Sequence, residues 1–207
     1  MLGLTQNEFY KIFKKSGNPE HRDPPAAQKA DVDVIVTLTN AFRPKTFLEI
    51  GINAGHTARR ILQFSPFIQS YVGVDIPFEY KETAGSQDNE VPKVAGSEVN
   101  DSRVKIITRL FGVKNIDPSE LGTFDFIFID GDHSYEGIKT DTEYCENILN
   151  PGGVMIWHDF PQLPYVYDYL MELNSKNNNE RIIWIENTLV AFRIGKMKND
   201  KYHYTHI

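Results

Sequence analysis

The feature that most constrains this chain is a repeated alternation of short apolar runs with helix-like segments. Five apolar runs follow one another between residues 46 and 159, and they read TFLEI, YVGVDI, VKIIT, FDFIFID and GVMIWHD. Such runs are typical of strands that are buried on both faces of a parallel sheet. Strands that alternate with helices form a sheet with helices on both sides. The sequence therefore predicts an α/β fold with a mainly parallel sheet.

Segments with helical character precede, separate and follow these runs. They are residues 5–15, 26–42, 56–64, 134–149 and 165–174. Pro44 follows the second of them and Asn150-Pro-Gly-Gly follows the fourth, and both are typical helix ends. Cys145, the only cysteine, lies on the apolar face of the fourth segment, which predicts a core residue. A single cysteine also excludes an intrachain disulfide and a cysteine-based zinc site.

The C-terminal part departs from the alternation. RIIWIE and LVAFRI are separated by a turn too short for a parallel crossover, so they are expected to form an antiparallel hairpin. The complete fold is then a Rossmann-like sheet of seven strands. We expect an N-terminal helix and loop over 1–25, a main domain over 26–194 and a polar tail over 195–207. Residues 76–103 lack a helical pattern and are interpreted as a mobile flap over the site, with an inert surface insertion as the alternative.

Charge and composition narrow the class of protein. The formal net charge is −6, which lowers the expectation of a nucleic-acid partner because such proteins usually carry a basic face. No run approaches the ~20 apolar residues of a membrane span. The N-terminus also lacks the apolar core of a secretory signal. We therefore expect a cytoplasmic enzyme of small molecules, with the leading helix or the tail available for pairing in a homo-oligomer.

A glycine-rich loop joins the first apolar run to the helix after it. FLEIGINAGHTARRIL places two glycines where a chain must turn sharply and approach a ligand closely. The next run ends in Asp75, at the distance expected of a carboxylate that binds both hydroxyls of a ribose. The loop lacks the G-x-G-x-x-G spacing of dinucleotide-binding folds. An adenosine-containing cofactor other than a dinucleotide is the better expectation.

The segment E-I-G-x-x-x-G resembles the first motif of class I S-adenosylmethionine-dependent methyltransferases, and the terminal hairpin resembles their last two strands. The resemblance covers roughly residues 26–194. It implies that Glu49, Gly51 and Gly55 line the methionine and ribose portion and that Asp75 holds the ribose. Asn53 stands where a glycine is common, and asparagine tolerates left-handed backbone angles. The expected cofactor contacts are Glu49, Gly51, Asn53, Gly55, Asp75 and Asp130. For Glu49 the alternative is a buried carboxylate that braces the loop.

Acids and histidines follow the fourth and fifth runs. Asp130 and His133 come after FDFIFI, and His158 and Asp159 come after GVMIW. Because adjacent parallel strands lie about 4.8 Å apart, Asp130 and Asp159 are expected to be close enough to share one ion. Carboxylates and water suit Mg²⁺, Ca²⁺ or Mn²⁺.

The segments IDGDHSYE and HDF resemble a branch of the methyltransferase family that includes relatives of macrocin O-methyltransferase. Catechol-type O-methyltransferases place acidic metal ligands at the ends of the same two strands. Asp130 and Asp159 match those positions, but Phe160 stands where that pattern continues with Asn or Asp. The third ligand is then His133, His158 or water, or the site holds no metal.

The resemblance implies methyl transfer from S-adenosylmethionine to a small acceptor, most simply the hydroxyl of a sugar, glycoside or phenol. A divalent metal such as Mg²⁺ can lower the cost of losing the acceptor proton. His133 is the alternative, as a general base, and Asp130 and His158 complete the expected catalytic set. Either histidine can instead have a structural hydrogen-bonding role, and Asp132 can cap the following helix. A nicotinamide-dependent oxidoreductase and a non-catalytic cofactor-binding module are the competing readings.

Overall fold

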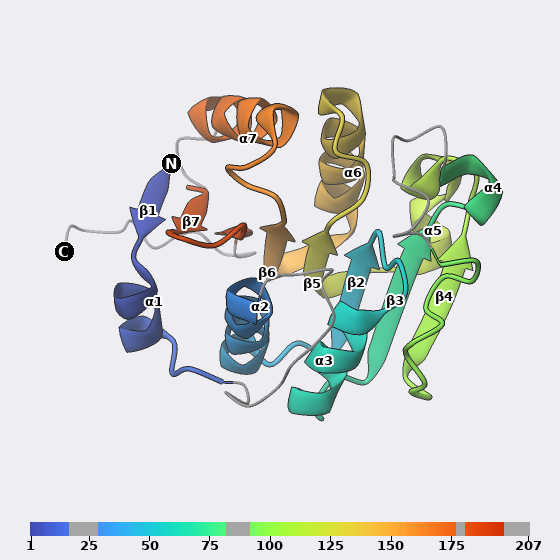
Figure 1. Cartoon of the computed structure of the whole chain (residues 1–207), viewed down its shortest axis with the longest axis horizontal. Coiled ribbons are helices and arrows are strands. Elements are labelled where there is room, and N and C mark those ends of the chain that lie inside the picture. Colours follow the sequence, from blue (N-terminus) through green and yellow to red (C-terminus); the bar gives the residue numbers. More distant parts are fainter. Residues whose placement is uncertain (17–28, 82–91, 177–180, 197–207) are drawn as a thin grey trace.

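One sheet runs through the molecule in the computed structural model, which describes residues 1–16, 29–81, 92–176 and 181–196. Within those ranges eight strands follow the order β1-β7-β8-β6-β5-β2-β3-β4 (Figure 1). They are β1 Leu2–Leu4, β2 Thr46–Ile50, β3 Ser70–Asp75, β4 Val104–Thr108, β5 Phe124–Ile129, β6 Leu149–Trp157, β7 Ile183–Ile185 and β8 Ala191–Ile194. All neighbouring strands are parallel except β8, which is antiparallel to both β6 and β7. The predicted fold class and the C-terminal hairpin are confirmed.

The predicted number of seven strands is wrong by one. The additional strand is β1, which pairs in parallel with β7 at the edge of the sheet. Its three residues are too few to carry a periodic signal, and its partner lies at the other end of the chain. The strand therefore leaves no signal in the local sequence from which it could be predicted.

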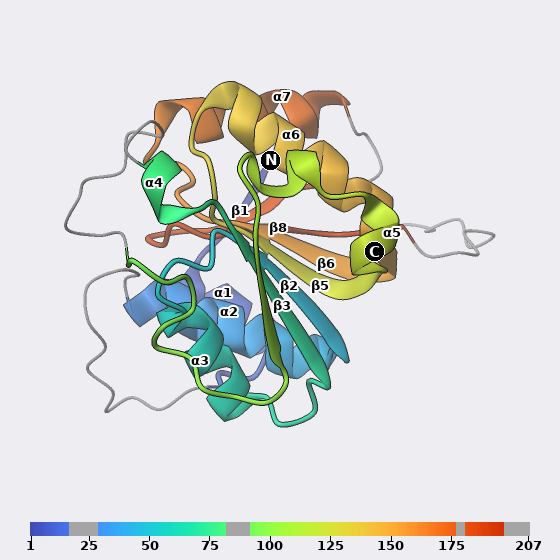
Figure 2. The ribbon, with the colours of Figure 1, turned by 90° about the vertical axis from the view of Figure 1, so that its right-hand side faces the viewer.

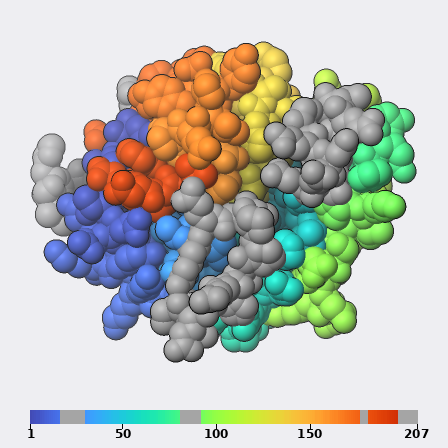
Figure 3. All heavy atoms as spheres, viewed as in Figure 1, coloured from blue at the N-terminus to red at the C-terminus, as the bar shows by residue number. Residues whose placement is uncertain are grey.

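Helices cover both faces of the sheet (Figure 2). On one face lie α1 Gln6–Ile12, α2 Lys29–Phe42 and α3 His56–Phe64, and on the other lie α6 Tyr135–Ile148 and α7 Pro164–Lys176. Three short pieces complete the set: α4 Phe78–Lys81, the 3₁₀ helix η3 Gly112–Asn115 and α5 Pro118–Leu121. The space-filling view shows α7 (orange) and α6 (yellow) packed side by side (Figure 3). No helix in the described part of the chain is long and apolar enough to cross a membrane.

The core is divided by the sheet because successive side chains of a strand point to opposite faces. In β5, Phe126 and Phe128 pack with α1, α2 and α3, whereas Ile127 and Ile129 pack with α6 and α7. Cys145 is fully buried on α6, as predicted. This packing on both faces is why each central strand reads as an unbroken apolar run.

The central strands end in register at one edge of the sheet. Ile50 of β2 pairs with Val74 of β3 and with Ile129 of β5, and Ile129 pairs with Trp157 of β6. The residues that follow these strands are therefore neighbours in space, although they are far apart in the sequence. They include most of the residues that the sequence predicts to bind the cofactor or a metal ion or to act in catalysis.

The segment 76–103 contains only the four-residue α4 and turns in its described part, and residues 82–91 lie outside the described residues. Its last portion is tied to the glycine-rich loop: Gly96 N–H donates to the Asn53 carbonyl at 2.7 Å, and Glu98 N–H donates to the Ala54 carbonyl at 2.8 Å. This portion is thus anchored, and the flap interpretation applies only to the remainder. The loop predicted around 17–25, the start of the helix at 26–28 and the tail beyond 196 also lie outside the described residues.

Candidate functional site

The glycine-rich loop after β2 is built from left-handed backbone positions. Gly51 has φ +85°, Asn53 +49° and Gly55 +89°. Glycine adopts such angles without strain, and asparagine is among the few other residues that visit them readily. The substitution of glycine by Asn53 is therefore compatible with the loop, as expected. Gly55 leads directly into α3 at His56.

Both glycines are needed because other parts of the chain come close. A Cβ on Gly51 would lie 2.0 Å from the carbonyl oxygen of Asp130, and one on Gly55 would lie 2.8 Å from Cγ1 of Val99. The loop thus packs directly against the end of β5 and against the segment that follows residue 92. The space beside these glycines is occupied by protein rather than left open for a ligand.

Asp75 ends β3 beside this loop and is 8% exposed. Its Oδ2 accepts the backbone N–H of Asn53 at 2.8 Å, and its Oδ1 accepts that of Ile76 at 2.7 Å. A cavity of about 370 Å³ lies directly beyond it, lined among others by Ile76, Val94 and Thr108. Asp75 thus holds the glycine-rich loop, and the cavity at the ends of β3 and β4 begins at the next residue, Ile76.

Glu49 lies in the interior of the sheet, and 1% of it is exposed. Its Oε2 accepts a hydrogen bond of 2.7 Å from the hydroxyl of Tyr71 on β3. Burial raises the pKa of Glu49 well above its ordinary value, against the opposing effect of that hydrogen bond. The observed contact joins β2 to β3 within the sheet. The cofactor contact of Glu49 and its alternative role as a brace of the loop both stay predictions.

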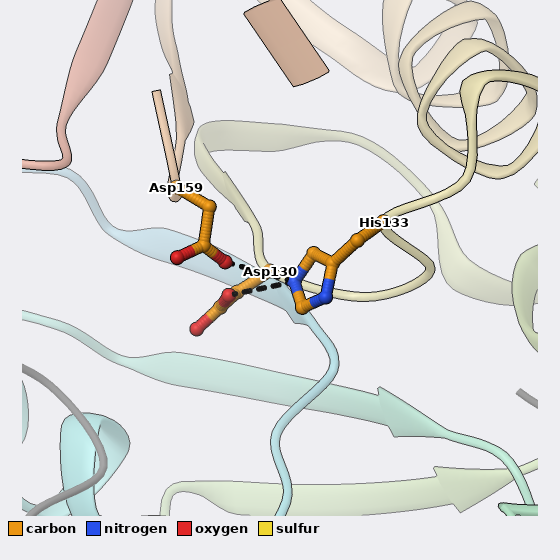
Figure 4. A group of neighbouring side chains, drawn as sticks. All are labelled: Asp130, His133 and Asp159. Carbon is orange, nitrogen blue, oxygen red and sulfur yellow. Dashed lines mark ion pairs between the residues drawn. The ribbon is translucent and has the colours of Figure 1, made fainter. Parts of the chain in front are cut away.

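Asp130, His133 and Asp159 converge at the ends of β5 and β6 (Figure 4). Nε2 of His133 lies 2.9 Å from Oδ2 of Asp159 and 3.6 Å from Oδ1 of Asp130. One ligand atom from each residue falls within 4.8 Å of the others, which is close enough for all three to hold a metal ion. The expected meeting of Asp130 and Asp159 is present in the geometry.

Two local features direct these side chains. Asp159 has φ +61°, a left-handed angle that turns its carboxylate out of the strand direction toward Asp130. Asp132 does not cap α6; it accepts the N–H of Ser134, and the Ser134 hydroxyl caps the helix by accepting the N–H of Gly137. This turn carries His133 over the end of β5.

Phe160 points away from the cluster. It is 2% exposed, stacks on Tyr167 and packs edge-on against Trp184. The position that carries a third ligand in the catechol-type pattern thus belongs to the apolar core here. In the described part of the chain, His133 joins Asp130 and Asp159 in a group that could hold a metal ion.

His158 lies on the buried side of the same cluster and is 6% exposed. Its Nδ1 is 3.3 Å from Oδ1 of Asp130 and 3.4 Å from Oδ1 of Asp159. Its Nε2 is 3.4 Å from Oδ2 of Asp31, a fully buried residue of α2. Sequence reasoning missed Asp31, although an acid at helical spacing from the core residues Val34 and Leu38 was a signal that it lies within the apolar face.

The charges of the cluster stabilise one another. Burial opposes ionisation of Asp130 and Asp159, but the neighbouring histidines hold the pKa of both carboxyls below the ordinary range. Hydrogen bonds to Asp130 and Asp159 raise the pKa of His133 to about 10. Burial lowers the pKa of His158, yet Asp130, Asp159 and Asp31 outweigh it and raise that pKa well above its usual value. At neutral pH the two carboxylates are therefore ionised and favour the protonated form of His133.

Comparison with known families gives a match over the middle of the chain. Residues 48–160, which contain both the glycine-rich loop and the acid–histidine cluster, match a family described as a methyltransferase domain. In the curated proteins the chain is 26% identical over 135 residues to the uncharacterised protein R132 of Acanthamoeba polyphaga mimivirus. That alignment covers 61% of this chain and spans 58% of the length of the relative.

Solved structures share the fold at low sequence identity. The O-methyltransferase TomG of Streptomyces achromogenes, in complex with SAM, is 15% identical, with a TM-score of 0.58 over 83% of this chain and 82% of that one. The SAH-bound methyltransferase PaMTH1 of Podospora anserina is 17% identical, with a TM-score of 0.60 over 92% of both chains. MycE methyltransferase of the mycinamycin pathway, in complex with Mg, SAH and mycinamycin VI, is 17% identical, with a TM-score of 0.52 over 81% of this chain and 51% of that one.

Proposed function

The chain belongs to the methyltransferase domain family that matches its residues 48–160, and we propose that it transfers a methyl group from S-adenosylmethionine to a hydroxyl group of a small molecule. The observation that carries this proposal is the Asp130–His133–Asp159 cluster beside the glycine-rich loop. The family accounts for the cofactor loop, and the cluster supplies groups that an acceptor oxygen requires. A module that only bound the cofactor would have no need of such a cluster.

The proposed cofactor site lies between the glycine-rich loop and the cavity beside Asp75. Asp75 ends β3 beside this loop, where its carboxylate accepts the N–H groups of Asn53 and Ile76, and it is the proposed ligand of the ribose hydroxyls. The cavity of about 370 Å³ beyond it is large enough for a purine base. Gly51, Asn53 and Gly55 shape the loop next to the methionine portion, with Asp130 at its far side, and Glu49 supports the loop from beneath.

The donor set also fits a divalent cation. Oxygen and nitrogen atoms of the cluster lie 2.9 to 3.6 Å apart, near the separation of about 3 Å between adjacent ligands of an octahedral ion. Asp130 and Asp159 are the proposed metal ligands. When bound, such an ion acts as a Lewis acid that favours the deprotonated acceptor oxygen and orients it. MycE, which shares this fold, was crystallised with Mg.

His133 is the proposed proton acceptor. Its side chain is 46% exposed, so an acceptor can reach it, and it faces both carboxylates. The two carboxylates raise its pKa to about 10. A cation held by Asp130 and Asp159 would offset this effect, and the imidazole would then be able to take the hydroxyl proton. His158 and Asp130 orient the site rather than exchange protons with the acceptor.

A hydroxyl acceptor of the glycoside or phenol type is the proposed substrate class. Carboxylates and a Lewis acid favour an oxygen nucleophile, because an alcohol must be helped to lose its proton at neutral pH. TomG and MycE are methyltransferases of small-molecule biosynthesis with the same fold. The family match disfavours the nicotinamide-dependent reading.

The test combines binding with turnover. Calorimetric titration should show binding of S-adenosylhomocysteine and none of NAD. Labelled S-adenosylmethionine with Mn²⁺ and a panel of glycosides and phenols should yield a methyl ether. Transfer should fail in Asp130→Asn but persist in the matched control Asp168→Asn, an exposed acid of α7. Cofactor binding with no transfer to any hydroxyl compound would favour a non-catalytic module, and binding of NAD alone would overturn the proposal.

A further inference from the structure

His158 is held between carboxylates on both of its edges. Asp31 lies 3.4 Å from Nε2, and Asp130 and Asp159 lie 3.3 and 3.4 Å from Nδ1. The ring is more than nine-tenths buried and is aimed into the cluster. It therefore differs from His133, which is 46% exposed at the open side.

Asp31 has a fixed orientation. Its Oδ1 accepts the backbone N–H of Leu189 at 2.8 Å, in the turn between β7 and β8, so only Oδ2 is directed at the imidazole. One carboxylate oxygen of Asp31 is therefore directed at Nε2 of His158, which favours the tautomer with its hydrogen on Nε2. With a cation bound between Asp130 and Asp159, a neutral ring in that tautomer would present the lone pair of Nδ1 to the cation.

We propose that Asp31 and His158 form the carboxylate–histidine pair of a mixed nitrogen–oxygen metal site, in which Nδ1 of His158 is a ligand beside Asp130 and Asp159. Metal-bound histidines usually donate their other N–H to a carboxylate or carbonyl, which fixes the ring and its tautomer. Asp31 is then a positioning residue, since it acts on the site only through His158. The inference rests on the proposed metal assistance of methyl transfer.

The proposed ligands, two carboxylates and one imidazole, determine which ion the site prefers. Imidazole nitrogen suits first-row transition metals, whereas Mg²⁺ prefers an all-oxygen shell. Two carboxylates with one buried imidazole should therefore select Mn²⁺ or Co²⁺ over Mg²⁺.

The Asp31→Asn variant is informative because its geometry is predictable. The amide oxygen of asparagine would replace Oδ1 as the acceptor for Leu189 N–H, leaving the NH₂ group toward His158. Nε2 would then accept rather than donate, and the hydrogen would move to Nδ1. That tautomer cannot ligate a metal, so the variant preserves shape while removing the ligand. Asp33→Asn is its matched control, because Asp33 is a buried acid of the same helix that instead faces Lys15 at 3.5 Å.

The experiment is Mn²⁺ titration of the full-length protein, followed by pulsed EPR for nitrogen coupled to the bound ion. We expect a directly bound nitrogen in the wild type and in His133→Gln, and its loss in His158→Gln. Asp31→Asn should weaken Mn²⁺ binding about 10- to 100-fold, while Asp33→Asn leaves it unchanged. S-adenosylhomocysteine affinity, measured by calorimetry, should remain the same in all variants that fold.

Several outcomes would overturn the inference. They are a nitrogen signal that persists in His158→Gln or disappears in His133→Gln, and Mn²⁺ affinity that is the same in Asp31→Asn as in Asp33→Asn. If His158→Gln does not fold, His133→Gln and the comparison of Asp31→Asn with Asp33→Asn still show which of the two histidines binds the ion. Methyl transfer that needs Mn²⁺ without any nitrogen signal would remove the His158 ligand and leave the proposed function intact. Absence of Mn²⁺ binding in the wild type would remove both the ligand and the metal assistance.

Discussion

The carboxylate of Asp75 accepts the backbone N–H of Asn53 at 2.8 Å, so the acid that ends β3 holds the glycine-rich loop that follows β2. The same carboxylate accepts the N–H of Ile76 through its other oxygen. It thereby helps to hold the loop in its left-handed path. Under the proposed function the same side chain would both brace the loop and bind the ribose.

Replacing Asp75 should weaken cofactor binding. Asp75→Ala removes the ribose acceptor and the partner of two N–H groups, and we expect a loss of roughly 1–3 kcal/mol in S-adenosylhomocysteine affinity. Asp75→Asn keeps one acceptor oxygen and should lie between Ala and the wild type. Calorimetry measures the effect, with Asp168→Ala as the exposed control. Unchanged affinity in Asp75→Ala would remove the ribose assignment.

The mainly parallel sheet and the edge of it that carries the site could be predicted from the sequence. Strands β2, β3 and β5 and the second half of β6 are buried on both faces, so each is a continuous apolar run, whereas β4 at the edge of the sheet is only partly buried. A polar residue directly follows β5 and β6. Because parallel strands end at one edge, Asp75, Asp130 and Asp159 could be placed there without a structure. Asp130 and His133 are only three positions apart in the sequence, so their proximity could be predicted as well.

Contacts between distant segments could not be predicted in this way. β1 joins β7 from the opposite end of the chain, and Asp31 reaches His158 from α2. Neither pairing leaves a periodic or spaced pattern in the sequence. The packing around Gly51 could not be predicted either, because the sequence near Gly51 does not show that the Asp130 carbonyl lies where a side chain would be.

Gly51 should be required for the fold itself as well as for the cofactor. A Cβ at this position would lie 2.0 Å from the carbonyl oxygen of Asp130, so Gly51→Ala is expected to destabilise the protein by more than about 3 kcal/mol. Gly112→Ala is the matched control, because Gly112 also has a positive φ (+56°) but has no atom within 4 Å of the added carbon. Its cost should be only about 1–2 kcal/mol, from the left-handed angle. Urea denaturation compares the two, and equal costs would show that the close approach to Asp130 is relieved by a small shift.

Asp141 should make the protein less stable as the pH rises. Burial and the negative charge of Asp132 raise its pKa to about 7 in the folded chain. Between its unfolded pKa of about 4 and that value, only the folded state keeps the proton, so stability falls as pH rises through this window. Asp141→Asn removes the titration and keeps the shape. Its stability relative to the wild type should therefore improve by on the order of 3 kcal/mol between pH 4 and pH 8.

Denaturant titration of both proteins at the two pH values measures this difference. Asp168→Asn, on the exposed face of α7, serves as the control and should show the same pH profile as the wild type. A constant difference between Asp141→Asn and the wild type at both pH values would mean that Asp141 is ionised in the folded protein.

The last prediction concerns the two carboxylates of the cluster. If Asp130 and Asp159 share a divalent ion that orients the acceptor oxygen, Asp159→Asn should lower the rate of methyl transfer about 10²- to 10³-fold, as loss of an electrostatic contact to a developing charge does. Affinity for S-adenosylhomocysteine should change little, since Asp159 follows β6 whereas the glycine-rich loop follows β2, and β5 lies between these two strands. EDTA should abolish wild-type transfer, and Mn²⁺ should restore it. The chelated wild type should then resemble Asp159→Asn, because in both the acceptor lacks the cation that favours its deprotonated form. Full activity in thoroughly chelated protein would instead leave His133 to act alone, and its pKa of about 10 beside two ionised carboxylates makes it a poor base at neutral pH.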